Sequence, residues 1–395
     1  MSILPVDKPP YILQSMKEIR AIPPNGLNVV STFSGCGGTC LGYEMAGYKV
    51  LWASEFIPAA QEVYRLNHPD TILDTKDIRL VSGEAILNQL GLKQGEVDVL
   101  EGSPPCASFS TSGQREKKWG EVVSYSDTKQ RVDDLFDEFI RLIDEIQPKV
   151  FVAENVSGLV KGVAKGYFKS ILASMRQLNY KVEVRLLNAA WLGVPQARER
   201  LFFIGVRSDL NKPPVFPKPL PYYYTLADAI PYIDKVKLGG KPNSWRIASE
   251  RPSPTITQSG AMRSQSGYFD GGGWVEAGAD ISGYAIGTEW ENLKQGETSN
   301  KYFNLSRPSF QKPSPTVTAH GAAVGLASVT HPTEKRKFSI AELKQVCSFP
   351  NDFQLTGTFQ KQWERIGRAV PPLMARAIAE TIRDTILCKE KIEDD

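Results

Sequence analysis

Alternating apolar and polar blocks divide the first half of the chain into strand and helix segments. Short apolar runs rich in β-branched residues predict buried strands, and apolar residues at every third or fourth position predict amphipathic helices. The predicted strands are residues 27–33, 49–54, 71–73, 97–100, 149–153, 181–187 and 201–206. Helices are predicted between them, at residues 39–46, 58–66, 136–146 and 166–178. Strands that alternate with helices indicate an α/β, doubly wound domain built on seven strands.

The pattern changes after residue 207. Prolines crowd residues 213–221, and the chain up to about residue 330 is rich in Gly, Ser, Thr, Pro and aromatic residues. The hexapeptide at residues 252–257 recurs at residues 313–318 with Val for Ile, which suggests two similar turn-plus-strand units. We therefore expect a second, smaller, mostly irregular or β domain at 208–330 and a hinge segment at 331–364. The first domain comprises residues 1–207 and 365–395.

The amino-acid composition limits the classes of protein to which this chain can belong. The 395 residues are 41% hydrophobic and 10% aromatic, which is typical of a globular protein with a large core. No apolar run approaches the ~18 residues of a membrane span, and residues 1–26 lack the pattern of a signal peptide, so we expect a cytoplasmic protein. Five cysteines without paired spacing and three histidines argue against a disulfide framework or a metal site. With a net charge of +3, any nucleic-acid contact would depend on local Lys and Arg patches.

Several chemically distinctive residues follow predicted strands. Residues 34–38 are a glycine-rich turn between a strand and a helix, which allows the backbone to approach a ligand. A dinucleotide fingerprint would need glycine where Cys40 stands, so a pyrophosphate site is disfavoured. Glu55 ends the second strand, where an α/β site places its acceptor for ribose hydroxyls. Asp77 and Ile78 follow the third, an acid and an aliphatic side chain that suit the amine and the face of an adenine.

The fourth strand leads into Ser103-Pro104-Pro105-Cys106. Two prolines end a sheet ladder, so the chain must turn and hold Cys106 at the strand tip. Taken alone, Cys106 is more simply a packed cysteine, since free cysteines are usually buried. The polar residues 107–130 that follow have the length of a lid or binding loop. Glu154 ends the fifth strand, and Arg198 and Arg200 form an i, i+2 pair that projects to one side.

In a doubly wound sheet these side chains would meet beyond the carboxyl ends of the strands. A thiolate beside a carboxylic acid, near a site for an adenosine-bearing cofactor, suits one reaction. The thiolate adds to C6 of a pyrimidine, the acid contacts N3, and C5 becomes nucleophilic toward an activated methyl group.

These motifs resemble, in order and spacing, those of the DNA (cytosine-5-)-methyltransferase family, from about residue 27 to residue 386. Residues 33–38 are similar to its F-x-G-x-G-G loop, residues 103–106 to its P-P-C motif and residues 154–156 to its E-N-V motif. Residues 196–200 are similar to Q-x-R-x-R and residues 367–371 to the final G-N-x-V-P. The resemblance implies a Rossmann-like methyltransferase domain with a target-recognition domain at about residues 208–330.

The resemblance implies methyl transfer from S-adenosyl-L-methionine to C5 of a flipped cytosine within a specific double-stranded DNA sequence, through a covalent Cys106 adduct. The implied catalytic residues are Cys106, Glu154, Arg198 and Arg200. The implied cofactor-binding residues are Phe33, Ser34, Gly35, Gly37, Gly38, Glu55, Asp77, Ile78, Pro104, Leu135, Arg368, Ala369 and Val370. The implied DNA contacts are Ser110, Ser112, Gln196 and Thr316, with Thr255 as a rival to Thr316. It also implies a monomeric prokaryotic modification enzyme whose cognate restriction endonuclease acts separately.

Four positions depart from the family pattern. Ser31 stands where an Asp is usual, Ala107 where a Gln is usual and Arg368 where an Asn is usual. Residues 130–135 also displace the arginine of the usual D-x-R-x-x-L. We expect these departures to affect cofactor affinity and DNA contacts rather than the chemistry at Cys106.

Other functions are disfavoured by single residues. An amino-methylating enzyme would place an aromatic residue after Pro-Pro, where Cys106 stands. A catalytically silent DNA-binding relative would lack the nucleophile or the glutamate, and both are present. The tRNA-modifying branch carries a Cys-Phe-Thr tripeptide that this chain lacks, so DNA is the expected substrate. A dehydrogenase is the third alternative.

Overall fold

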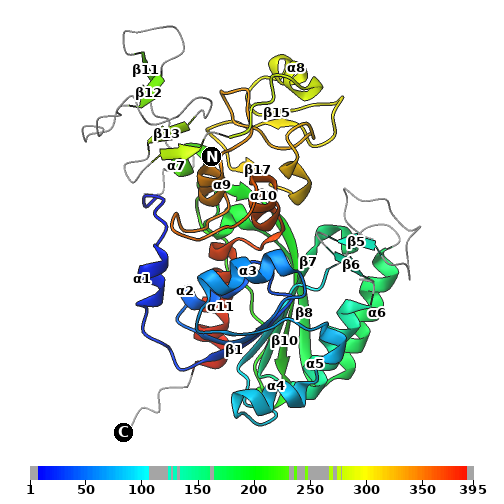
Figure 1. Cartoon of the computed structure of the whole chain (residues 1–395). Helices are drawn as coiled ribbons and strands as arrows, with labels where there is room; N and C mark the ends of the chain where they lie inside the picture. Colours follow the sequence, from blue (N-terminus) through cyan, green and yellow to red (C-terminus); the bar gives the residue numbers. More distant parts are fainter. Residues whose placement is uncertain are drawn as a thin grey trace.

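A seven-stranded sheet forms the centre of the computed structural model (Figure 1), which describes residues 8–105, 123–125, 128–130, 134–160, 164–230, 235–237, 245–247, 267–269, 274–276 and 278–388. Its strands are β1 (Asn28–Thr32), β2 (Lys49–Ser54), β3 (Ile72–Asp74), β4 (Val99–Gly102), β7 (Val150–Val156), β8 (Tyr180–Asn188) and β10 (Glu199–Arg207). The strand order is β3-β2-β1-β4-β7-β10-β8. The first five are parallel, and β10 is antiparallel to β7 and β8. The predicted doubly wound, seven-stranded domain is confirmed.

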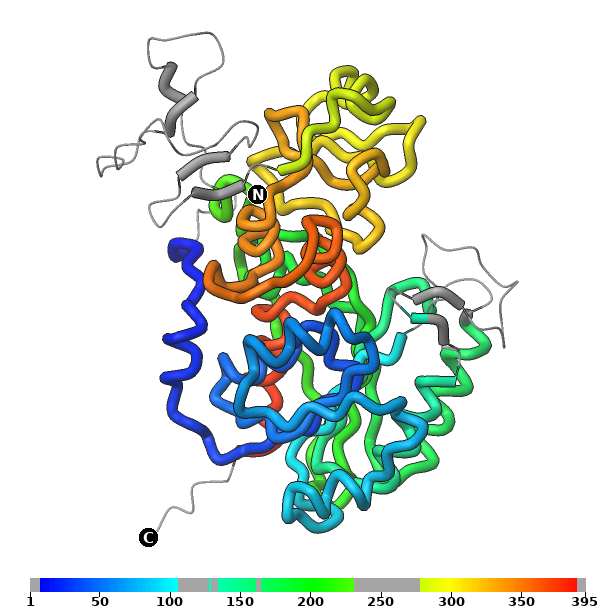
Figure 2. The backbone as a smooth tube through the Cα atoms, in the orientation of Figure 1, coloured from blue at the N-terminus to red at the C-terminus, as the bar shows by residue number. Residues whose placement is uncertain are grey.

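Helices cover both faces of this sheet. Helices α2 (Gly38–Met45), α3 (Pro58–Asn67) and α11 (Pro372–Ile382) contribute to the core on one face. Helices α4 (Gly83–Leu90), α5 (Leu135–Ile146) and α6 (Ala164–Gln177) contribute to the core on the other. Figure 2 shows the C-terminal α11 beside the N-terminal α2, and a Cβ on Gly42 would lie 2.5 Å from the Cβ of Ala375. Segments more than 300 residues apart in sequence therefore close this layer.

Two element boundaries differ from the prediction for local reasons. Strand β4 begins at Val99, two residues later than the apolar run, because Asp98 accepts a hydrogen bond from the Asn28 amide and pairs with Lys149. Helix α9 (Ile340–Val346) is shorter than the stretch whose sequence pattern predicts a helix, residues 337–349. Ser339 caps it in a reciprocal capping box with Glu342, and Ser348 adopts a left-handed conformation just past its end.

The remaining elements are short. The helices are α1 (Met16–Arg20), α7 (Leu226–Ala229), α8 (Ala285–Asn292) and α10 (Phe359–Arg368), and single turns are η1 (Ile78–Leu80), η3 (Ser157–Val160), η4 (Ala189–Leu192), η5 (Ser208–Leu210), η6 (Ala319–Ala322) and η7 (Arg383–Leu387). The paired strands are β5 (Val123–Tyr125) with β6 (Thr128–Gln130), β11 (Lys235–Lys237) with β12 (Trp245–Ile247), β13 (Gly267–Phe269) with β14 (Trp274–Glu276), β15 (Glu297–Thr298) with β16 (Ser306–Arg307), and β9 (Gln196–Ala197) with β17 (Ser314–Pro315).

The buried apolar residues described between α7 and α10 lie in two cores. Five residues of the region around α8 form a separate small core: Ile281, Ile286, Trp290, Leu293 and Leu305. Val317, Phe338 and Trp363 instead share a core with Leu41 and Val63 of α2 and α3. The segment after β17 is thus packed against the sheet domain. Across the described ranges, no helix has the length and apolar character to cross a membrane, and no cluster of His, Cys, Asp and Glu could hold a metal ion.

Candidate active site

The loop between β1 and α2 adopts a conformation that most residues avoid. Phe33, Gly35 and Gly37 all have positive φ, at 55°, 58° and 89°. A Cβ on Gly37 would lie 2.1 Å from Nε2 of His68, and a Cβ on Gly38 would lie 2.6 Å from the Val370 carbonyl oxygen, so both positions need glycine for packing. At Gly35, by contrast, no heavy atom lies within 4 Å of where a Cβ would stand. Gly35 is therefore where a ligand can approach the backbone.

Glu55 lies at the end of β2, against this loop. Its carboxylate accepts hydrogen bonds from the Gly35 and Ile57 amides, each at 2.7 Å. Burial raises the pKa of Glu55, and these two bonds and the nearby Arg365 oppose the shift. A carboxylate offers about four lone-pair positions, so it can still accept from the hydroxyls of a ligand. The residues of the loop and Glu55 thus fit a group that carries a ribose.

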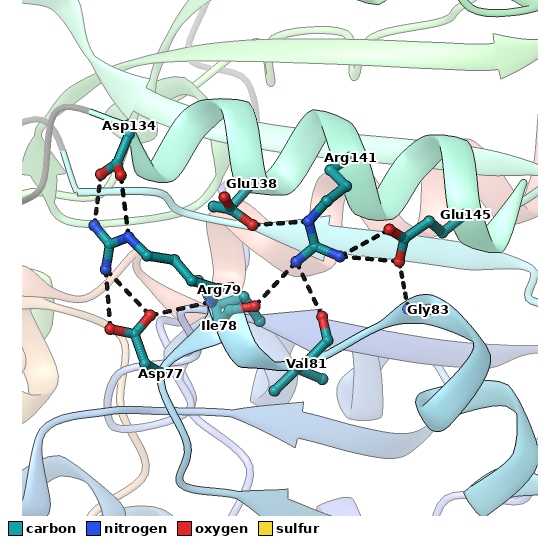
Figure 3. A network of polar contacts seen from close by, with 9 residues as sticks. All are labelled: Asp77, Ile78, Arg79, Val81, Gly83, Asp134, Glu138, Arg141 and Glu145. Carbon is teal, nitrogen blue, oxygen red and sulfur yellow. Dashed lines mark hydrogen bonds and ion pairs between the residues drawn. The ribbon is translucent and has the colours of Figure 1, made fainter.

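Asp77 and Ile78 lie at the start of η1, within a network centred on two arginines (Figure 3). Arg79 donates to Asp77 and, from Nε at 3.0 Å, to Asp134 at the start of α5. Arg141 donates to the Ile78 carbonyl oxygen at 3.0 Å. Leu135, the next residue of α5, is 3% exposed. Arg79 is not among the residues predicted from the sequence, yet it links the segment after β3 to the start of α5.

At the end of β7, Glu154 pairs with Arg200 of β10. Arg200 Nε lies 2.9 Å from Glu154 Oε1, and both side chains are mostly buried. Burial lowers the pKa of Arg200, and the charge of Glu154 opposes this effect. The next residue, Asn155, donates from Nδ2 to the carbonyl oxygen of Pro104 at 3.2 Å. The glutamate and the Pro104-Pro105 turn are therefore held together at one edge of the sheet.

Gln196 and Arg198 are both enclosed by protein. Gln196 accepts from the Val317 amide at 3.1 Å and donates to Cys347 Sγ at 3.1 Å. Arg198 is 2% exposed and donates to the carbonyl oxygens of Val317 at 2.8 Å and Gly367 at 3.1 Å. Burial and then the charge of Arg200 lower the pKa of Arg198 to about 9. Gln196, expected at DNA, and Arg198, expected in catalysis, both fasten the chain around residue 317.

Thr316 is also held by contacts with residues 196 and 197. Its hydroxyl donates to the Ala197 carbonyl oxygen at 2.9 Å, and Ser314 of β17 pairs with Gln196 of β9.

The final motif reaches the glycine loop from the far end of the chain. The Val370 carbonyl oxygen and the Ala369 Cβ are the nearest neighbours of a Cβ built on Gly38. Arg368 points its side chain along α10, where Nε donates to Glu364 at 2.9 Å. Cys106, Ser110, Ser112 and Thr255 lie outside the described residues.

Glu101 is the residue that sequence analysis missed in the middle of the sheet. It is 2% exposed on β4 and hydrogen-bonded to Ser31. An acid inside an otherwise apolar strand was the available signal, since buried carboxyl groups are costly without partners.

The chain is similar to known proteins over nearly its whole length. The family described as C-5 cytosine-specific DNA methylase matches residues 27–384. Type II methyltransferase M.DdeI of Desulfomicrobium norvegicum is 33% identical over 387 residues, covering 90% of this chain and 88% of the relative. Type II methyltransferase M1.HphI of Haemophilus parahaemolyticus is 32% identical, covering 90% and 86%.

Solved structures share the fold. A protein assigned as a DNA modification methyltransferase of an E. coli prophage has a TM-score of 0.67 at 23% identity, covering 92% of this chain and 100% of that one. Spodoptera frugiperda DNMT2, as a mutant, has a TM-score of 0.58 at 16% identity, covering 91% and 99%.

Proposed function

The chain belongs to the C-5 cytosine-specific DNA methylase family, and from that premise we propose which residues carry out its methylation of cytosine C5 in DNA. The family implies S-adenosyl-L-methionine as the cofactor, which supplies the methyl group. The observation that carries the proposal is the junction of β4 and β7, where Asn155 bonds to Pro104 beside the Glu154–Arg200 pair. This junction would hold an acid next to the residue that follows Pro105.

The cofactor would bind along the tips of β1, β2 and β3. The open side of Gly35 and the remaining lone pairs of Glu55 support this assignment for the loop and the ribose. Asp77 and Ile78 would contact the adenine, with Leu135 behind them. The cofactor-binding set further includes Phe33, Ser34, Gly37, Gly38, Pro104, Arg368, Ala369 and Val370.

Cys106 would act as the nucleophile. A stacked cytosine shields C6, so the base must first be flipped out of the duplex at a cost of a few kcal/mol. The Cys106 thiolate then forms a bond to C6, and Glu154, oriented by Arg200, contacts N3 as charge develops on the ring. C5 would take the methyl group from the sulfonium of the cofactor, which would leave as S-adenosyl-L-homocysteine. Loss of the C5 proton and cleavage of the bond to Cys106 then restore the aromatic ring.

DNA would be recognised by residues 208–330. Thr316 would contact a phosphate beside the flipped base. The Thr316 hydroxyl donates to Ala197, and Gln196 and Arg198 bond to the backbone of the next residue, Val317, so they would hold Thr316 in place. Ser110 and Ser112 would contact DNA from the loop after Cys106. The enzyme would work as a monomer, and its likeness to type II methyltransferases favours a role as the modification partner of a separate restriction endonuclease.

A trapped adduct tests the nucleophile. Duplex DNA with 5-fluorocytosine at the target position has no C5 proton to lose, so the enzyme should stall as a complex that survives denaturing electrophoresis, only with S-adenosyl-L-methionine present. Cys106→Ser should abolish the complex, because a hydroxyl is far less ionised than a thiol near neutral pH. Cys388→Ser, at an exposed thiol far from the proposed site in sequence, is the control and should leave it intact.

A complex that persists in Cys106→Ser would contradict this assignment. Methylation found on the exocyclic amine instead of C5 would do the same.

A further inference from the structure

Glu101 places a carboxyl group in a buried strand that is otherwise apolar. It follows Val99 and Leu100 in β4, and in the strand register it pairs with Ser31 of β1. The side chain is almost fully buried, at 2% exposure. Because a buried carboxyl group is costly unless hydrogen-bonded, an apolar residue would serve better if position 101 only filled space. The reason that an acid stands at this position therefore lies in the hydrogen bonds of Glu101.

A chain of side-chain hydrogen bonds leads from Glu101 to the glycine loop. The Ser31 hydroxyl donates to Glu101 Oε1. Ser31 Oγ also lies 2.7 Å from Ser34 Oγ. With the Ser31 proton directed to Glu101 Oε1, Ser34 is the donor to Ser31. The two hydroxyls thus link the carboxyl group of Glu101 to the loop.

The same chain branches to the helices on one face of the sheet. Cys40 of α2 donates from Sγ to Ser31 Oγ at 3.2 Å, and Tyr64 of α3 donates to Cys40 Sγ at 3.3 Å. Glu101 therefore connects β4 and β1 with the two helices that flank the loop.

Ser34 is the point at which this chain meets the backbone of the loop. It lies between Phe33 and Gly35, both at positive φ, and a left-handed conformation is unfavourable for a residue such as Phe33. Backbone strain of this kind persists only where the surroundings hold it. Besides its side-chain bond, Ser34 accepts from the Gly37 amide at 2.9 Å. Tethering Ser34 therefore fixes the turn that exposes Gly35.

We infer that Glu101 is a positioning residue for the cofactor: its carboxyl group anchors the Ser31–Ser34 hydroxyl chain and so holds residues 33–38 in the ligand-ready conformation. Glu101 itself touches neither cofactor nor cytosine. The inference rests on the proposed function only in assigning the cofactor to this loop.

Hydrogen exchange in the ligand-free protein tests the anchor without the cofactor. In Glu101→Leu and in Ser31→Ala, the amides of Gly35 and Gly37 should exchange about tenfold faster, the effect of one lost buried hydrogen bond on local opening. Amides of β7 should be unchanged. Glu101→Gln keeps an acceptor oxygen for Ser31 and should retain the slow exchange. Ser31→Ala removes a single hydroxyl, so the test stands even if Glu101→Leu does not fold.

Calorimetric titration with S-adenosyl-L-methionine tests the consequence. Affinity should fall about tenfold in Glu101→Leu and in Ser31→Ala, and stay within about threefold of the starting protein in Glu101→Gln. The double variant should lose no more than either single one, because both act through one chain.

Unchanged loop exchange in both disrupting variants, or additive losses of affinity, would overturn the inference. If the starting protein binds no S-adenosyl-L-methionine, the cofactor assignment fails instead, and the exchange experiment still decides the role of Glu101.

Discussion

The buried carboxyl group of Glu101 should make the stability of the protein depend on pH. Burial raises the pKa of Glu101 from the usual 4.5 to about 8, against the hydrogen bond from Ser31, and the nearby Glu154 adds to the rise. An acid with a raised pKa in the folded state holds its proton more tightly there than in the unfolded chain. Its contribution to stability is therefore complete below about pH 4.5 and is lost as pH rises toward 8.

The size of the effect follows from the two pKa values. Each unit of difference corresponds to about 1.4 kcal/mol, and at pH 7 the protein lies about two and a half units above the usual pKa of the group. Glu101 should therefore cost about 3 kcal/mol of folding free energy at pH 7 relative to a residue that never ionises. Glu101→Gln provides this comparison, because a glutamine side chain never ionises and has the same shape as glutamate.

Pulse proteolysis in urea at pH 5, 6, 7 and 8 can measure this difference. The stability of Glu101→Gln relative to the starting protein should rise steadily from pH 5 and level off near pH 8. The change with pH is the test, because it does not depend on how well the new amide is bonded at any one pH. Glu62→Gln, at an exposed carboxylate of α3, is the matched control and should show no such rise. Parallel profiles for Glu101→Gln and the starting protein would show that the carboxyl group ionises normally and would refute the argument from burial.

Two further predictions concern catalysis and recognition. Glu154→Gln should slow methyl transfer by roughly 10²-fold or more, the scale expected for a positioned acid, while S-adenosyl-L-methionine binding measured by calorimetry stays unchanged. Glu183→Gln, at an exposed acid of β8, is the control. A loss of cofactor affinity as large as the loss of rate would indicate a structural role for Glu154. Replacing residues 208–330 with the corresponding segment of another family member should change the methylated sequence, read by bisulfite sequencing, because we assign base contacts to this segment and chemistry to the sheet domain; an active chimera with the original specificity would contradict the domain assignment.

The sequence was most informative about features that depend on neighbouring residues. Apolar runs predicted every strand of the central sheet, and the glycine turn and Glu55 were predicted at the strand ends where the structure has them. The partners of buried polar groups could not be predicted in this way. Arg198 bonds to carbonyl oxygens more than 100 residues away, and backbone acceptors leave no mark on the sequence.

The roles of Glu101 and Arg79 could not be predicted from the sequence because they too depend on partners that are distant in the chain. The partner that gives each of them its role comes from another strand or helix and is not visible in the sequence: Ser31 for Glu101 and Asp134 for Arg79.

The stretch from Gln196 to Arg200 connects the proposed recognition and catalytic parts of the enzyme. Gln196 and Arg198 bond to the Val317 backbone, and the Ala197 carbonyl oxygen accepts from the Thr316 hydroxyl. Arg200, at the end of the same stretch, pairs with Glu154. A phosphate contact at Thr316 and an acid at Glu154 would thus be positioned by a single five-residue segment.

The β9–β17 pairing separates the region around α8 from the pair formed by Arg200 and Glu154. The β9–β17 pairing fastens the chain where it returns from the region around α8, whose small core is separate from that of the sheet. Residues before β17, to which we assign the base contacts, could therefore vary without disturbing the pairing of Arg200 with Glu154. A substitution at Arg198 would instead release the Val317 and Gly367 backbones together, and so would affect the Thr316 contact and the final motif at the glycine loop at once.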